Sequence, residues 1–180
     1  MKRLAAASAV ALILATPALA ALGIGAKAPD FSTQVSLAGK PMPFNLKTAL
    51  KKGPVVLYFY PAAFTQGCTI EAHDFAEATD DFNKMGATVI GMSADKIETL
   101  NKFSVEECRN KFAVGSATAA TISAYDVVLP LKPDKSNRTS YVIAPDGKVI
   151  FAYSALGPQG HVTGTMDAVK AWRAKHPLKG

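Results

Sequence analysis

Two continuous runs of apolar residues, Val55–Tyr60 and Ala87–Met92, restrict the fold of this chain more than any other feature. Both runs are rich in β-branched or aromatic side chains, as strands buried on both faces of a sheet usually are. The residues between them show the four-three spacing that places side chains on one face of a helix. The positions on that face are Cys68, Ala72, Phe75, Thr79 and Phe82. The pattern predicts a strand, a helix and a second buried strand.

The rest of the chain adds further helices and strands to this unit. Residues 21–53 are expected to be loop-rich, and residues 130–137 to form a polar loop. The Ser93–Asp95 turn is expected to cap a helix that runs to about Glu106, and a strand at 112–114 and a helix at 117–125 should follow. The last expected elements are a hairpin of strands 139–144 and 149–153 around the Pro145–Lys148 turn, and a helix with Met166, Val169 and Trp172 on its inner face. This order predicts an α/β fold with a mixed central β-sheet flanked by helices, as in a thioredoxin-like core.

The first 20 residues have the pattern of an export signal. Lys2 and Arg3 precede an uncharged apolar run at 4–15, and Ala18–Ala20 fits the small-x-small rule for cleavage. An uncleaved membrane anchor is the alternative, but the apolar run is short for a bilayer span. We expect a signal peptide at 1–20 with cleavage after Ala20, a periplasmic location without stable membrane association, and a single domain at 21–180.

The charge pattern bears on the class of partner. The chain has 20 basic and 14 acidic residues, and cleavage would remove two basic residues and leave a net charge of +4. The remaining basic residues are scattered, and Lys51 and Lys52 are their only adjacent pair. A nucleic-acid surface needs a clustered basic patch, so no nucleic-acid partner is expected.

Only two cysteines, Cys68 and Cys108, occur in the chain. They are too few for a zinc cage of four thiolates, and neither lies in a C-x-x-C pair. The histidines His73, His161 and His176 lack the spacing of metal ligands, and we expect each to be a surface residue or a helix cap. In an exported protein a disulfide between the cysteines is allowed, in a structural or a catalytic role.

Cys68 lies directly after a buried strand, at the start of the predicted helix. The unpaired N–H groups and the dipole of a helix N-terminus stabilise negative charge, so a thiol at this place can be an activated nucleophile. Gly67 permits a close approach of the backbone, Thr65 offers a hydroxyl, and Pro61 limits solvent on one side of the turn. A buried cysteine that acts as a small apolar side chain explains the position equally well. Position alone leaves both interpretations open.

Four segments of the chain resemble the peroxiredoxin family. The pattern P-x-x-x-T-x-x-C, from Pro61 to Cys68, matches the active-site motif of that family. The other three segments are G-x-x-A-P-D-F at 25–31, V-I-G-M-S-A-D at 89–95 and N-R-T-S-Y-V-I-x-x-D-G at 137–147. They follow the family's order and span most of residues 23–175. The chain is most similar to the bacterioferritin-comigratory, or Q-type, subgroup.

This resemblance implies a thioredoxin-like fold and a thiol peroxidase that reduces hydrogen peroxide and organic hydroperoxides. Cys68 would be the peroxidatic cysteine and would become a sulfenic acid. Thr65 would hydrogen-bond to the thiolate and the peroxide, Arg138 would stabilise the moving charge, and Pro61 would shield the site. Without the motif, Arg138 would be interpreted as a surface charge. Because sulfur carries the electrons, no metal and no organic cofactor is implied.

The second cysteine is open to three interpretations. Many Q-type members carry a resolving cysteine five residues after the peroxidatic one, where this chain has His73, and Gln66 replaces a proline common in the motif. Some members resolve from the region of Cys108, which implies an intramolecular Cys68–Cys108 disulfide. Alternatively, Cys108 is inert and an outside thiol resolves Cys68, or the two form a permanent structural bridge. Bridging needs Cα atoms within about 7 Å, so local unwinding is expected if Cys108 resolves Cys68.

Two other functions are compatible with the fold but lack their motifs. A disulfide oxidoreductase would need a C-x-x-C pair, and a copper chaperone would need C-x-x-x-C, where residue 72 is alanine. The expected partners are a hydroperoxide and a thioredoxin-like or other thiol reductant. The short tail after Trp172 lacks the long C-terminal arm of decameric peroxiredoxins, so we expect a monomer or a small dimer.

Overall fold

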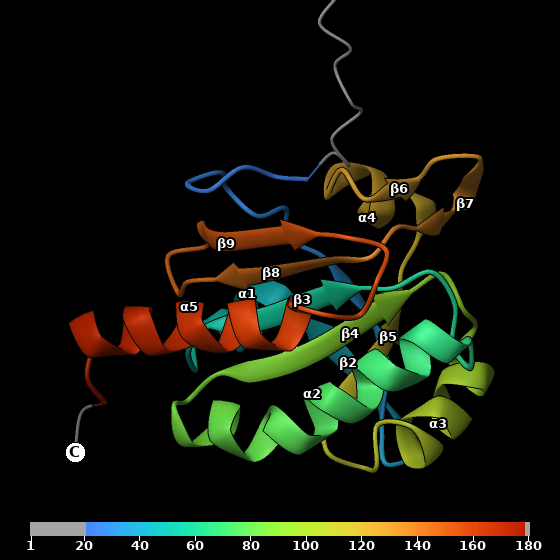
Figure 1. Ribbon diagram of the computed structural model, residues 1–180, viewed down its shortest axis with the longest axis horizontal. Coiled ribbons are helices and arrows are strands. Elements are labelled where there is room, and N and C mark those ends of the chain that lie inside the picture. The colour runs from blue at the N-terminus through green and yellow to red at the C-terminus, as the bar shows by residue number, and fades with distance from the viewer. Residues whose placement is uncertain (1–20, 179–180) are drawn as a thin grey trace, which may run out of the picture.

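The computed structural model describes residues 21–178, so the expected export signal and its cleavage site lie outside the described residues. A seven-stranded mixed sheet with the order β2-β1-β5-β4-β3-β8-β9 has helices on both faces (Figure 1). The strands are β1 (Ser32–Leu37), β2 (Lys40–Asn45), β3 (Val55–Phe59), β4 (Thr88–Ser93), β5 (Ala113–Ser116), β6 (Val128–Leu129), β7 (Lys132–Ser136), β8 (Thr139–Ile143) and β9 (Val149–Ser154). The helices are α1 (Leu46–Leu50), α2 (Gln66–Lys84), α3 (Ile97–Glu106), α4 (Ala119–Ala124) and α5 (His161–Lys175). The expected α/β fold with a mixed central sheet is confirmed.

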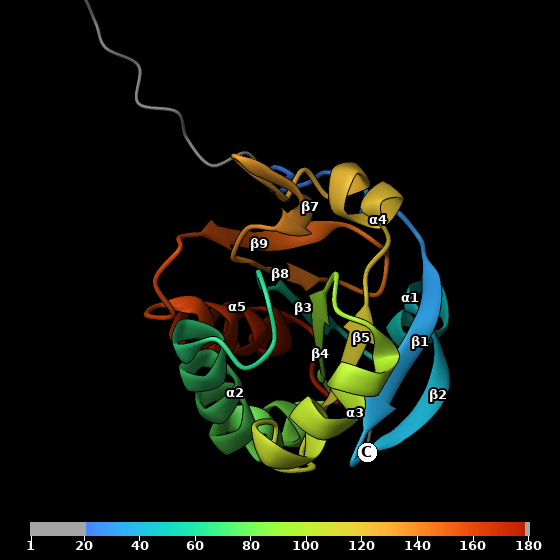
Figure 2. The ribbon, with the colours of Figure 1, turned by 90° about the vertical axis from the view of Figure 1, so that its right-hand side faces the viewer.

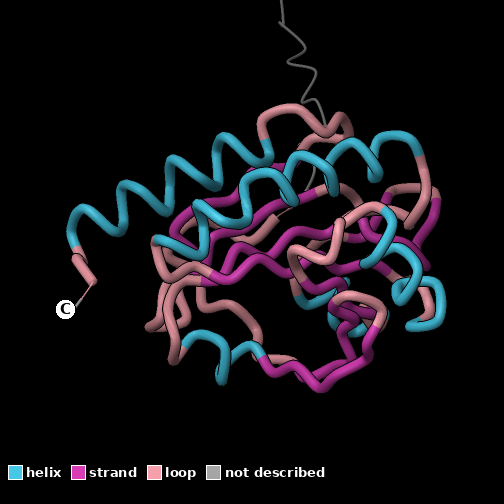
Figure 3. The backbone as a smooth tube through the Cα atoms, turned by 90° about the horizontal axis from the view of Figure 1, so that it is seen from below, coloured by secondary structure: helices cyan, strands magenta, loops and turns pink. Residues whose placement is uncertain are grey.

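The strand β3 separates two hydrophobic cores, because successive side chains of a strand point to opposite faces of the sheet. The odd-numbered residues of 55–60 pack with α1 and α4, and the even-numbered residues pack with α2, α3 and α5. Figure 2 shows helices on both sides of the sheet, and Figure 3 shows α2 and α5 side by side over one face of it. All five residues of β3 are buried, as its apolar sequence predicts.

The register of the sheet fixes which segments meet at the end of β3. Strand β8 is antiparallel to β3, and Thr139 at its start pairs with Phe59 at the end of β3. Helix α2 begins seven residues after Phe59. The residue before β8 therefore lies beside the first turn of α2, and this residue is Arg138.

Residues 21–53 contain more regular structure than expected. They form the hairpin β1–β2 and the short helix α1. Ala38 and Gly39 form the two-residue turn, both with positive φ, and such turns match the twist of paired strands. Pro41 and Pro43 lie on β2, the outermost strand, where no further strand needs the N–H groups that proline lacks. The prediction of a loop-rich segment was wrong because it took the prolines as signs of a loop, whereas here they lie on an edge strand.

The expected polar loop at 130–137 was also wrong, because most of it belongs to the two-stranded ribbon β6–β7. Leu131 turns the chain between the strands with a φ of 68°. Three of the five β7 residues are exposed, so the strand carries no apolar pattern that could distinguish it from a loop.

Two expectations for helix positions need correction. Asp95 does not cap α3, whose N-cap is Lys96 and has no side-chain cap bond. The carboxylate of Asp95 instead accepts hydrogen bonds from Ala63 N (2.7 Å) and Ser93 Oγ (2.8 Å). These bonds tie the loop before α2 to the end of β4. On α5, Val169 is buried and the half-buried Met166 packs against the same core, as expected, whereas the half-buried Trp172 stacks on the ring of His176. Among the described residues, no helix is long and apolar enough to span a bilayer.

Candidate active site

Cys68 is the third residue of α2 and is buried, with 1% of its surface exposed. Thr65 is the N-cap of the helix, but its side chain makes no capping bond. The Thr65 hydroxyl donates to the carbonyl of Ala62 at 3.0 Å, rather than to Cys68 as the motif implied. Pro61 is half-buried at the start of the same loop. The thiol thus lies in the first turn of a long helix, where backbone N–H groups lack intrahelical acceptors.

Arg138 reaches Cys68 from the position just before strand β8. Its Nη2 donates to Cys68 Sγ at 3.3 Å, its Nη1 donates to Glu71 Oε2, and its Nε donates to the carbonyl of Leu156 at 2.8 Å. Only 4% of the side chain is exposed, so the interpretation of Arg138 as a surface charge is wrong. A Cβ atom at Gly67 would lie 3.0 Å from Nη2. Glycine at this position therefore leaves room for the guanidinium beside the thiol.

Glu71 is the part of this site that sequence reasoning missed. It lies one helical turn after Cys68 and is fully buried. Burial raises its pKa to about 8, although the adjacent Arg138 lowers it. Burial also disfavours the charge on Arg138, but Glu71 and Cys68 outweigh burial and raise the pKa of Arg138. A usable signal existed: an acidic residue stands on the otherwise apolar inner face of the helix.

His161 is also buried, against the expectation of a surface residue or cap. Its Nδ1 lies 2.8 Å from Ser140 Oγ and 3.6 Å from Glu71 Oε1, and its Nε2 lies 3.1 Å from the carbonyl of Ala155. Because a carbonyl only accepts, Nε2 carries the proton and Nδ1 accepts from Ser140. Burial lowers the pKa of His161 to about 4. A neutral imidazole therefore borders the Arg138–Glu71 pair.

These two shifted groups predict how stability depends on pH. Glu71 keeps its proton in the folded chain up to about pH 8, but loses it near 4.5 when unfolded. The folded chain therefore binds more protons across this window, and its stability falls as the pH rises. His161 acts in the opposite sense, but only between about 4 and 6.5. We expect the free energy of unfolding to fall by roughly 1 to 2 kcal/mol between pH 6.5 and 8.

Urea unfolding of the wild type and the Glu71→Gln variant at several pH values measures this effect. The difference between the two curves isolates Glu71 from all other titrating groups. The difference should change steeply between pH 6.5 and 8 and little below pH 4.5. Parallel curves across that range would show that Glu71 does not hold its proton in the folded chain.

Cys108 lies two residues after the end of α3 and is fully buried. Both cysteines are free thiols. Burial raises the pKa of Cys108 far above its ordinary value, so this thiol is protonated and unreactive where it lies. Burial, followed by the smaller effects of neighbours that include both cysteines, raises the pKa values of Tyr58 and Tyr60. Both tyrosines and both cysteines belong to the same hydrophobic core.

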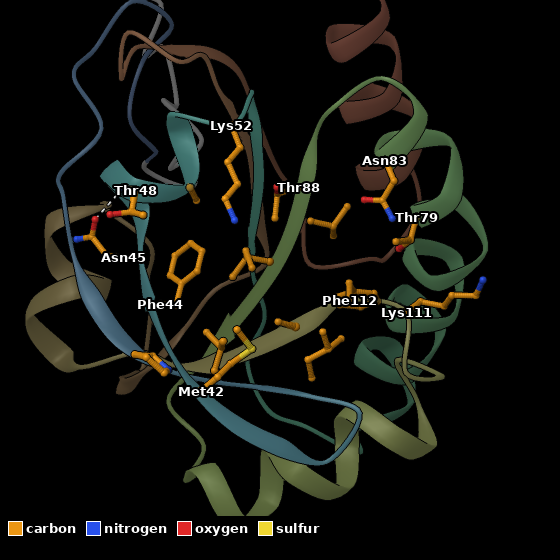
Figure 4. A pocket seen from close by; sticks show the side chains of 17 residues that line it. Met42, Phe44, Asn45, Thr48, Lys52, Thr79, Asn83, Thr88, Lys111 and Phe112 are labelled. Carbon is orange, nitrogen blue, oxygen red and sulfur yellow. Dashed lines mark hydrogen bonds between the residues drawn. The ribbon is translucent and has the colours of Figure 1, made fainter.

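A cavity of about 390 Å³ lies elsewhere, between the β1–β2 hairpin, α1 and the starts of β4 and β5 (Figure 4). Its lining is mostly apolar, with Met42, Phe44 and Phe112 among the larger side chains, and Lys52 at one side. The lining contains no cysteine, histidine or carboxylate. The cavity therefore offers no thiol, and no imidazole or carboxylate that could activate its threonine hydroxyls, so the chemistry points to Cys68. Among the described residues, no group of three or more potential ligands could hold a metal ion.

Comparisons with known proteins agree with the geometry at Cys68. Residues 24–152 match the AhpC/TSA family. The chain is similar to Peroxiredoxin Bcp of Xanthomonas campestris, with 29% identity over 122 residues, which cover 65% of this chain and 76% of that protein. It is also similar to Peroxiredoxin Bcp of Escherichia coli K12, with 28% identity over 155 residues, which cover 83% of this chain and 97% of that protein.

A solved structure extends the similarity to the fold. The crystal structure of Peroxidoxin BcpB from Mycobacterium tuberculosis superposes with a TM-score of 0.73 and 30% sequence identity. The match covers 82% of this chain and 96% of that one.

Proposed function

The chain belongs to the AhpC/TSA family of peroxiredoxins, in the bacterioferritin-comigratory subgroup, and is a thiol-dependent peroxidase; we propose that Cys68 is the residue that attacks the peroxide. The observation that carries this proposal is the contact between Cys68 Sγ and Arg138 Nη2 at the N-terminus of α2. A buried cation and the helix dipole both favour a negatively charged sulfur. The thiolate is the nucleophilic form of cysteine.

In the proposed first step, the sulfur of Cys68 gives an electron pair to the terminal oxygen of the hydroperoxide, and the O–O bond breaks. Cys68 is oxidised by two electrons to a sulfenic acid. The other oxygen takes up a proton and leaves as water or as an alcohol. Arg138 supports the negative charge as it moves from sulfur to the leaving oxygen. Thr65 would turn its hydroxyl from Ala62 to the peroxide, and Pro61 would keep bulk water from one side.

We propose that Cys108 then resolves the sulfenic acid. Its thiol would attack the sulfur of Cys68, forming the disulfide and releasing the hydroxyl of the sulfenic acid as water. Cys108 is buried in the folded chain, so the segment around it has to open before the thiol can react. The free thiols of both cysteines agree with a bond that opens and closes, and they do not favour a permanent structural bridge.

The family implies a peroxide substrate and a thiol reductant. We propose that a dithiol reductant of thioredoxin type returns two electrons to the disulfide, and that the enzyme works as a monomer or small dimer. We further propose a periplasmic location, because residues 1–20 have the pattern of an export signal. Cell fractionation with sequencing of the mature N-terminus tests the location, and a start at Ala21 is the expected result.

Peptide mapping tests the proposed cycle directly. After one equivalent of peroxide, the non-reduced protein should yield a linked peptide that joins Cys68 to Cys108. The Cys108→Ser variant should instead hold a sulfenic acid at Cys68 that a dimedone probe labels. The contrary result in the oxidised wild type is that dimedone labels Cys68 while Cys108 stays a free thiol. This result would show that Cys108 does not resolve the sulfenic acid and that an outside thiol does.

A further inference from the structure

Three ion pairs fasten helix α2 to the segment that contains Cys108. On α2 the participants are spaced by four and three residues, so they lie along one face of the helix. On the other side they are every second residue of 107–111, which we call the Cys108 segment. The pairs are His73–Glu107 at 2.7 Å, Glu77–Arg109 at 3.1 Å and Asp80–Lys111 at 2.8 Å. The two series match in register, and we call the three pairs the clasp.

The signs of charge along the clasp are complementary. Helix α2 presents a histidine followed by two carboxylates, and the Cys108 segment presents a carboxylate followed by two cations. The first pair is ionic only when His73 is protonated, whereas the other two pairs join groups that are charged at neutral pH. A shift of the segment by one pair would leave one residue of each series unpaired, and of the two remaining pairs only one would join opposite charges. The clasp thus favours one position of the segment on α2.

The Cys108 segment has features that work against its folded position. Arg109 and Asn110 both adopt positive φ angles, of 50° and 60°. Such a conformation is unfavourable for a residue with a side chain, although less so for asparagine. The hydroxyl of Tyr58, which belongs to the same hydrophobic core as Cys108, is buried and has no hydrogen-bond partner among the described residues. Opening of the segment would relieve the strained backbone and admit water to this hydroxyl.

We propose that the clasp sets the rate at which Cys108 is released to attack oxidised Cys68, and therefore the lifetime of the sulfenic acid. This inference rests on the proposed role of Cys108. While the segment is closed, the buried thiol cannot reach Cys68, so the rate of disulfide formation follows the fraction of chains in which the segment is open. A sulfenic acid that waits longer can react with a second hydroperoxide, giving a sulfinic acid and an alcohol or water. The clasp therefore controls the balance between turnover and irreversible inactivation.

The double variant Glu77→Gln/Asp80→Asn tests this proposal. Both side chains are exposed, so the changes remove charge without altering the core. Rapid quenching with dimedone measures the lifetime of the sulfenic acid, and mass spectrometry measures the sulfinic acid formed in each turnover. Loss of two exposed ion pairs in the double variant should make the lifetime of the sulfenic acid about fivefold shorter than in the wild type. The fraction of Cys68 converted to sulfinic acid should fall by a similar factor. The rate of the first reaction with peroxide should stay unchanged, because no residue of the clasp contacts Cys68 or Arg138.

The Asp81→Asn variant is the matched control. Asp81 pairs with Lys84 on the same helix at 2.8 Å and is similarly exposed, but this pair does not reach the Cys108 segment. Asp81→Asn should leave the sulfenic acid lifetime as in the wild type. Raising KCl to about 0.5 M screens exposed pairs, so it should shorten the lifetime in the wild type and the control but hardly in the double variant.

The outcomes separate this inference from the role of Cys108 itself. If the Cys68–Cys108 peptide forms but its rate is the same in the double variant and the control, the clasp does not govern opening, and the proposed cycle stands. If the peptide never forms, the resolving role fails and the clasp proposal fails with it. A shorter lifetime in Asp81→Asn as well would attribute the effect to the charge of α2 in general and would also overturn the proposal.

Discussion

Peroxide consumption should disappear completely in the Cys68→Ser variant. A serine hydroxyl is a far weaker nucleophile than a thiolate, and its oxygen cannot accept the peroxide oxygen to form an acid that a thiol later reduces. The fold should persist, because the replaced side chain is small and only its sulfur contacts Arg138. The loss of activity is measured as the rate of peroxide consumption in an excess of dithiol reductant, monitored with an electrode or a dye.

The matched variant is Cys108→Ser, which replaces the other buried cysteine. It should react with the first equivalent of peroxide at the wild-type rate, because Cys108 takes no part in that step. Its continued turnover should depend on an outside thiol. Full activity in Cys68→Ser would exclude Cys68 as the attacking thiol, and an equal loss in both variants during the first turnover would point to a structural effect.

Removal of the Arg138 guanidinium should give the second largest effect. In Arg138→Gln the sulfur loses the cation that lies 3.3 Å away. The loss of one positioned charge of this kind lowers a rate by about 100- to 1000-fold. The variant also leaves the protonated carboxyl of Glu71 buried without its partner, and an unsatisfied buried polar group costs about 1 to 3 kcal/mol of stability. A loss of activity in this single variant could therefore come from a slower reaction with peroxide or from unfolding of the protein.

The double variant Arg138→Gln/Glu71→Gln separates the two causes. It replaces the Arg138–Glu71 contact by two neutral amides that can hydrogen-bond to each other, so most of the lost stability should return. The rate of the first reaction with peroxide should stay low, because the sulfur still lacks a cation. Urea unfolding and single-turnover kinetics measure the two quantities. Recovery of both stability and rate in the double variant would show that Arg138 only holds the structure together.

The central part of the fold was predictable because its signals are local. The apolar run at 55–60 and the helical pattern after Cys68 each depend on side chains close together in the sequence. The β1–β2 hairpin was not predictable from the same signals, because Pro41 is excluded from a central strand but allowed at an edge. Whether a strand lies at an edge depends on the whole sheet.

The candidate site divides in the same way. The placement of Cys68 at a helix N-terminus follows from local pattern, and Arg138 came from a resemblance rather than from physical reasoning. His161 lies 90 residues after Glu71 in the sequence, and only the packing of α5 against α2 and β8 brings them together. A sequence does not show such contacts, because burial of a polar side chain is decided by elements that are distant in the chain.

The prolines of the hairpin have a consequence for how copies of this chain can associate. An exposed sheet edge can pair with the edge of another molecule, and the two edges here are β2 and β9. Pro41 and Pro43 lack the N–H donors that pairing along β2 would need. The start of β9 is bonded to Gly25 and Ala26, but its later residues form a strand without proline. Of the two edges of the seven-stranded sheet that the structure describes, only β9 can therefore extend into a continuous intermolecular sheet. This sheet can join the sheet of one other copy but cannot grow into a fibre.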